Sequence, residues 1–199
     1  MQRQRILESA REVFFRDGFM AANLDEVANK AGVAKGTLYR YFDNKAELYV
    51  AMLLQKGEIF AAKLTEAGDP ALRAHDQVRR MSRFYLEHWT TNREYFQIFW
   101  ALENESVIGE LPEAVVGQVT SLWEQCLRIL SGVLERGTRS GEFAAHDSWE
   151  VAHILWTLAN GLIQAEQAPA TRNLRRRPVE AVFEDAVELC LRGIAPGPR

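Results

Sequence analysis

Helical periodicity along almost the whole chain is the feature that most limits its fold. Apolar residues such as Ile6, Val13 and Phe14 recur at the three- and four-residue spacing of one helix face. No segment alternates apolar and polar residues over enough positions to predict a strand. Gly18 and Gly32 interrupt the pattern near the beginning, where glycine favours a helix end. The sequence therefore predicts an all-α protein.

Capping residues and turns divide this pattern into about nine expected helices. They are expected over residues 2–17, 23–30, 35–42, 45–64, 70–90, 94–104, 112–136, 148–167 and 178–193. The expected N-terminal caps are Asn23 with Glu26, Asp69 before Pro70, Thr91 with Glu94, and Asp147 with Glu150. We expect two domains, a helix-turn-helix head over residues 1–46 and a larger helical body over 47–199.

The head has the arrangement of a helix-turn-helix motif. Two short helices joined by a tight turn with glycine place the second helix in the major groove of DNA. Leu38 and Phe42 are expected to face inward, and this leaves the remaining side chains of that helix outside. Arg40 can pair bidentately with guanine, and Thr37 can contact a phosphate or a thymine methyl group. Gly36 allows the backbone to approach the DNA closely.

Charge is distributed unevenly along the chain, whose formal net charge is -3. Residues 1–45 contain eight Lys/Arg and six Asp/Glu, whereas the remainder contains sixteen and twenty-one. A basic end on an acidic body suits a protein of which one end approaches a polyanion.

The segment NLDEVANKAGVAKGTLYRYFDNKAEL resembles the DNA-binding head of the TetR family of transcriptional regulators. The matching positions are Asn23, Val27, Ala28, Ala31, Gly32, Val33, Gly36, Leu38, Tyr39, Tyr41, Phe42, Lys45, Glu47 and Leu48. Asn23 replaces the usual Thr and Tyr41 replaces a common His. The match covers about the first fifty residues, and beyond them only the helix pattern is similar.

This resemblance implies a homodimer on a near-palindromic operator, released by a small molecule bound in the body. It places Lys35, Gly36, Thr37, Tyr39 and Arg40 where the family reads DNA, and Tyr41 and Lys45 where it grips phosphates. Asn23 is included with these predicted DNA contacts. Lys45 begins a helix, where its charge opposes the helix dipole, and a phosphate would explain that location.

Aromatic residues of the body suggest an effector pocket. Phe96, Phe99 and Trp100 share one helix face, with Glu103 one turn further on. Such residues usually form core, but a cavity lined in this way suits an apolar or aromatic ligand. The candidate effector-binding residues are Phe60, Phe84, His88, Phe96, Phe99, Trp100, Glu103, Trp123 and Trp156.

Two late helices are apolar on two faces, which predicts burial on both sides. One face of each can pack on its own body and the other on a second copy, as in a four-helix dimer interface. The candidate interface residues are Val151, Leu155, Leu158, Leu162, Val182, Phe183, Ala186 and Leu189. The alternative is a larger monomeric core.

Other classes of protein are less well supported by the sequence. It contains no phosphate-binding glycine loop, nucleophile elbow or metal-binding histidine pair, so we expect no enzyme activity, cofactor or metal. A DNA-binding scaffold with a solid core and no effector remains the competing interpretation. We find no membrane span or signal peptide and expect a cytoplasmic protein. Cys126 and Cys190 are expected to be inert thiols.

Overall fold

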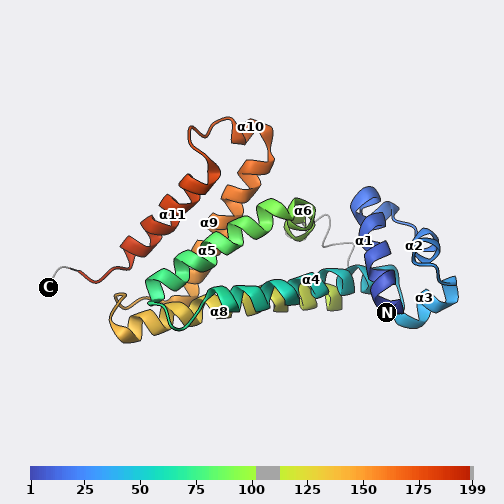
Figure 1. Cartoon of the computed structure of the whole chain (residues 1–199), viewed down its shortest axis with the longest axis horizontal. Helices are drawn as coiled ribbons and strands as arrows, with labels where there is room; N and C mark the ends of the chain where they lie inside the picture. The colour runs from blue at the N-terminus through green and yellow to red at the C-terminus, as the bar shows by residue number, and fades with distance from the viewer. Residues whose placement is uncertain (102–112, 198–199) are drawn as a thin grey trace. The chain divides into compact units, whose positions relative to one another are not determined.

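The computed structural model describes residues 1–101 and 113–197, and these ranges contain ten helices and no strand (Figure 1). The predicted all-α fold is confirmed. The chain divides into two compact units. Unit 1 comprises Met1–Ile59 and Gln97–Leu122, and unit 2 comprises Phe60–Phe96 and Trp123–Arg199. The division at residue 46 stays a prediction.

Unit 1 begins with α1 (Gln2–Ala21), α2 (Leu24–Ala31) and α3 (Lys35–Tyr41), followed by the first part of α4 (Lys45–Ala67). Gly18 leaves helical geometry with φ of 76°, so the backbone of α1 breaks at the predicted residue before one last turn. Asn23 caps α2 by accepting a hydrogen bond from the Asp25 backbone N–H at 2.8 Å. The expected capping box is incomplete, because the Glu26 carboxylate pairs with Arg16 at 2.7 Å.

The core of this head consists of apolar side chains from its short helices. Ile6 and Phe14 of α1, Val27 of α2 and Leu38 of α3 are each at most 2% exposed. Helices of seven or eight residues are not stable alone in water, so this burial is what maintains α2 and α3. The inward positions predicted for Leu38 and Phe42 are confirmed.

Unit 2 is built around α5 (Ala74–Thr91), α9 (Ser148–Gln167) and α11 (Val179–Gly193), which all contact one another (Figure 1). The other helices with residues in unit 2 are the end of α4, α6 (Arg93–Ala101), α8 (Glu113–Ser140) and α10 (Pro169–Arg172). Asp147 caps α9 as predicted, accepting from the backbone N–H groups of Trp149 and Glu150. No described helix has the length and apolar character needed to cross a membrane.

The predicted start of α5 is wrong. Asp69 accepts from the Ala71 backbone N–H within a turn, and the helix begins only at Ala74. The Glu142 carboxylate from the segment after α8 caps it instead, accepting from the backbone N–H groups of Ala74 (3.1 Å) and His75 (3.4 Å). This cap lies 68 positions from the helix it stabilises, so local sequence could not indicate it.

Replacing Glu142 by alanine removes the acceptor of two otherwise unpaired N–H groups at the start of α5. We expect Glu142→Ala to lower the free energy of unfolding by about 0.5–2 kcal/mol, measured by urea denaturation. The control is Glu135→Ala, which removes only an exposed carboxylate 3.9 Å from Arg139. Equal stability of the two variants would contradict the capping role.

Candidate nucleic-acid interface and effector cavity

The outer face of α3 is the candidate DNA-reading surface. Gly32 ends α2 in the left-handed conformation with φ of 63°, and the chain re-enters a helix at Lys35. Because Leu38 is fully buried, Lys35, Gly36 and Arg40 lie on the exposed side. Tyr39 is 41% exposed, and Thr37 is half-buried. The face therefore presents an ammonium, a guanidinium and hydroxyl groups to the solvent.

Gly36 is not required by the packing of the protein itself. A Cβ atom added there would meet nothing within 4 Å, and its backbone is ordinary for a helix. A larger residue would fit in the free protein. The absence of a side chain therefore leaves room for close approach by an external group, as expected where a helix backbone lies against DNA.

Two cations of the face differ in their surroundings. Lys35 forms an exposed ion pair with Asp25 of α2 at 2.7 Å, and this hydrogen bond raises the pKa of Lys35. Arg40 forms no ion pair with any residue that the structure describes. Its guanidinium is therefore available for bidentate contact with a base.

Lys45 and Tyr41 contact the protein's own groups at the positions expected to bind phosphate. Lys45 donates from Nζ to the carbonyl oxygens of Met20 (2.8 Å) and Ala22 (3.3 Å) and lies 5.2 Å above the Phe19 ring. These carbonyls explain a lysine at the start of α4 without any phosphate. The Tyr41 hydroxyl donates to the Gln2 amide oxygen at 3.3 Å. The Lys45–Met20 and Tyr41–Gln2 bonds are exposed and could be exchanged for a phosphate, whereas the Lys45–Ala22 bond is partly buried.

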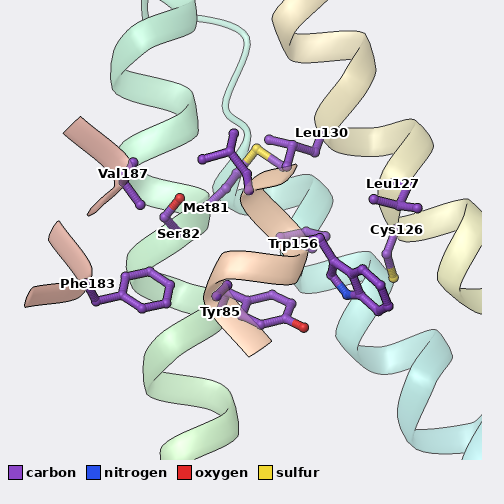
Figure 2. Close-up of a pocket in the computed structure, with 12 residues that line it drawn as sticks. Met81, Ser82, Tyr85, Cys126, Leu127, Leu130, Trp156, Phe183 and Val187 are labelled. Carbon is purple, nitrogen blue, oxygen red and sulfur yellow. The ribbon is translucent and has the colours of Figure 1, made fainter. Parts of the chain in front are cut away.

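Unit 2 contains a small apolar cavity that the sequence did not predict. Figure 2 shows side chains of α5, α8, α9 and α11 around it. The lining residues are Leu64, Met81, Ser82, Tyr85, Cys126, Leu127, Leu130, Leu155, Trp156, Ala159, Phe183 and Val187. The cavity has a volume of about 40 Å³. That is room for roughly three waters, whereas pockets for drug-sized ligands measure roughly 300–1,000 Å³.

Four of the nine predicted effector residues lie in an aromatic cluster with Trp89. Phe60 lies 5.4 Å from the Phe84 ring and 4.8 Å from the His88 ring, and Trp89 lies 5.8 Å from Phe96. Phe60 and Phe96 are at most 4% exposed. Phe60 and Phe96 are therefore core, where a ligand would have to separate packed rings, whereas Phe84 and His88 are half-buried and line a surface groove.

The remaining effector candidates have separate positions. Trp156 lines the cavity, and the Trp123 ring lies 6.2 Å from it. Phe99 is buried and belongs to unit 1. The side chain of Trp100 and the whole of Glu103 lie outside the described residues. Helical spacing shows which aromatic residues of one helix share a face. It does not show that Tyr85 and Trp156, which lie on different helices, line the same cavity.

Burial raises the pKa of the Cys126 thiol to about 12 and raises that of Cys190 to a smaller extent. Both side chains therefore remain protonated thiols at neutral pH. This agrees with the expectation that neither is reactive.

Comparison with known proteins bears directly on the head. The model of the family described as bacterial regulatory proteins, tetR family, matches residues 6–52. The HTH-type transcriptional regulator YhgD of Bacillus subtilis is 30% identical over 162 residues, which are 81% of this chain and 82% of YhgD. The chain belongs to the TetR family. It is a DNA-binding transcriptional regulator and not an enzyme.

Two further comparisons extend the similarity to the body. The HTH-type transcriptional activator FasR of Mycolicibacterium smegmatis is 28% identical over 200 residues, covering 99% of this chain and 84% of FasR. The crystal structure of FadR from Bacillus subtilis in complex with stearoyl-CoA superposes with a TM-score of 0.76. It is 20% identical and covers 96% of this chain and 98% of that one, so it supports the fold of both units.

Arg40→Ala tests base reading by the TetR head. The substitution removes the guanidinium that has no ion-pair partner among the described residues. We expect a loss of about 1–3 kcal/mol in binding the preferred sequence, and relaxed preference at one base pair per half-site. Fluorescence anisotropy with the preferred site and single-base variants measures this. Arg128→Ala on α8 is the control, and equal effects of the two would rule out base reading by Arg40.

Lys45→Ala tests phosphate contact. We expect weaker binding to preferred and random DNA alike, with the slope of log affinity against log salt reduced by about 1. Circular dichroism checks that the head stays folded without the bonds from Lys45 to Met20 and Ala22. Lys45→Arg keeps the charge and serves as the matched control. An unchanged salt slope in a folded Lys45→Ala protein means that Lys45 contacts no phosphate.

Proposed function

We propose that the protein is a cytoplasmic, homodimeric repressor that binds a pseudo-palindromic operator and releases it when an apolar effector binds. The observation that carries the proposal is that the two units carry sites of different chemistry. Unit 1 presents the exposed polar face of α3, whereas unit 2 encloses an apolar cavity. The proposed DNA contacts are Asn23, Lys35, Gly36, Thr37, Tyr39, Arg40, Tyr41 and Lys45.

The helices α9 and α11 supply the proposed dimer surface. They contact each other and leave large apolar side chains on the outside: Ile154 is 54% exposed and Leu189 is 69% exposed. Exposed apolar side chains on packed helices favour association with another protein surface, and a second copy offers the same one.

The structure refines which predicted interface residues remain available for this surface. Leu155 and Phe183 are at most 5% exposed and line the cavity, so they belong to the core and not to the dimer proposal. Val151, Leu158, Leu162, Val182 and Ala186 are half-buried, and they stay in the proposal with Leu189. Ile154 joins them, one position beside the predicted stripe.

Leu189→Glu places a charge on this surface. We expect the variant to be monomeric at a micromolar concentration at which the wild type is dimeric, because association would bury an unpaired carboxylate. Analytical ultracentrifugation gives the masses. Leu174→Glu is the matched control, since Leu174 is 81% exposed but lies outside α9 and α11. A monomeric wild type rules out the dimer, and a dimeric Leu189→Glu protein places its interface elsewhere.

The effector proposal rests on the lining of the cavity. Leucine, methionine and aromatic side chains favour an apolar molecule, and the related FadR is described in complex with stearoyl-CoA, which carries a long acyl chain. An acyl chain exceeds about 40 Å³, so lining side chains must move to admit it. Met81 is suited to this because its unbranched side chain adapts to different shapes.

A regulator with a solid core and no effector is the second candidate, and the small cavity is the observation that favours it. The sign of regulation is also only a proposal. The related FasR is named an activator, the opposite of the repression proposed here. Selection from random DNA, followed by transcription of a reporter carrying the selected site, tests both operator binding and its sign.

Operator release distinguishes the two candidates. We expect long-chain or aromatic compounds, more than sugars or metal ions, to quench tryptophan fluorescence and release the selected DNA. Trp156→Phe should remove much of the quench, because Trp156 lines the cavity. Trp100→Phe should retain it, and the reverse result would favour the pocket predicted from the sequence. If no compound releases DNA that the protein binds well, the regulator without an effector is the correct candidate.

A further inference from the structure

The first turn of α1 places two arginines beside the candidate DNA-reading helix. Arg3 and Arg5 are exposed, and this turn contains no acidic residue. Neither guanidinium forms an ion pair with a residue that the structure describes. Cations at the start of a helix oppose its dipole. Lys45 compensates by donating to two carbonyl oxygens, whereas no described residue accepts a hydrogen bond from either arginine.

Arg3 lies at the C-terminal end of α3. Its guanidinium carbon Cζ is 5.4 Å from the centre of the Phe42 ring, and Phe42 directly follows α3. The neighbouring Gln2 accepts a hydrogen bond from the Tyr41 hydroxyl at 3.3 Å. Tyr41 is one of the proposed phosphate contacts, so Arg3 extends that part of the surface. The aromatic ring attracts the cation and so positions its charge before DNA binds.

Arg5 lies near the other end of α3. A Cβ atom added at Gly32 would be only 2.6 Å from Nη2 of Arg5, so the guanidinium lies against the turn that leads into α3. The missing side chain of Gly32 therefore makes room for the arginine. Gln4, between the two arginines, accepts a hydrogen bond from the Gln55 side chain of α4 at 2.5 Å, which fixes this turn to the head. Figure 1 shows the N-terminal end of α1 beside α3.

Guanidinium groups beside α3, and not on its outer face, suit the DNA backbone better than the bases. A seven-residue helix is about 10 Å long, a length over which duplex DNA carries roughly six phosphates. Phosphates therefore lie within reach of cations at both ends of α3 when its outer face enters a groove. The planar guanidinium can donate two parallel hydrogen bonds to one phosphate.

We propose that Arg3 and Arg5 form a second DNA-binding element, which binds backbone phosphates at the two ends of α3. These contacts do not depend on the base sequence, so they add affinity and fix the position of the head on the duplex. Discrimination between bases remains with α3. The inference rests on the proposed DNA-reading role of α3 and extends the DNA-binding surface to the first turn of α1.

Removing each charge tests this element in the full-length protein. Arg3→Gln and Arg5→Gln should each weaken binding to the selected DNA and to random duplex by a similar factor. Each should also reduce the slope of log affinity against log salt by about 1 for every phosphate contact that is lost. Single-base variants of the selected DNA should keep their order of affinity. Fluorescence anisotropy at several salt concentrations measures all three quantities.

Two controls separate phosphate contact from other effects of the substitutions. Arg11→Gln removes an exposed arginine of the same helix, whose guanidinium lies 6.0 Å from the centre of the Phe15 ring of α1 itself, and it should keep the wild-type salt slope. Arg3→Lys and Arg5→Lys conserve the charge and should also keep that slope. Circular dichroism reports whether each variant is folded.

Three results would overturn the inference. One is a wild-type salt slope in folded Arg3→Gln and Arg5→Gln proteins. Another is a loss of affinity with an unchanged slope, because the arginines would then only support the packing of the head. The third is a loss confined to the selected DNA, which would mean an indirect effect on α3. In each case Arg40→Ala still tests the α3 face separately: if it leaves base preference unchanged, that face is wrong and the inference fails with it.

Discussion

Burial of the apolar side of α3 is the constraint on which the function of the head depends. A seven-residue helix does not persist in water by its own hydrogen bonds, so its existence requires packing against α1 and α2. Leu38, which is fully buried, fixes the rotation of α3 about its axis. Gly36 and Arg40 must then face outward. The same apolar contacts that make the head fold therefore decide which side chains are exposed for the proposed DNA contacts.

In the free protein, two of the cations of the head contact groups of the protein itself. Lys35 forms an ion pair with Asp25, and Lys45 donates hydrogen bonds to two backbone carbonyls. A DNA phosphate would replace the Asp25 partner of Lys35 at little cost, because exposed ion pairs contribute little to stability. Arg40 has no such partner among the described residues, which suits the base contact proposed for it.

Local signals in the sequence predict the helices well. The start of α5 and the position of the cavity depend on contacts between residues that are distant in sequence. Asn23 and Asp147 cap helices beside them in sequence, and both caps are confirmed. The prediction for Asp69 is wrong because Glu142, far along the chain, caps α5 instead. The cavity presents the same difficulty, since its walls come from five helices. The spacing of Phe96, Phe99 and Trp100 predicts a shared face but cannot tell whether open space or other rings cover it.

In the proposed mechanism, one protein binds DNA through α3 and an apolar ligand in unit 2, and each partner weakens binding of the other. Thermodynamic linkage requires both effects to have the same factor. This coupling is measured by the affinity for a long-chain compound that quenches tryptophan fluorescence, with and without saturating selected operator. We expect the operator to weaken ligand binding by the same factor by which the ligand weakens operator binding. Equal ligand affinity in the presence and absence of operator would contradict the mechanism.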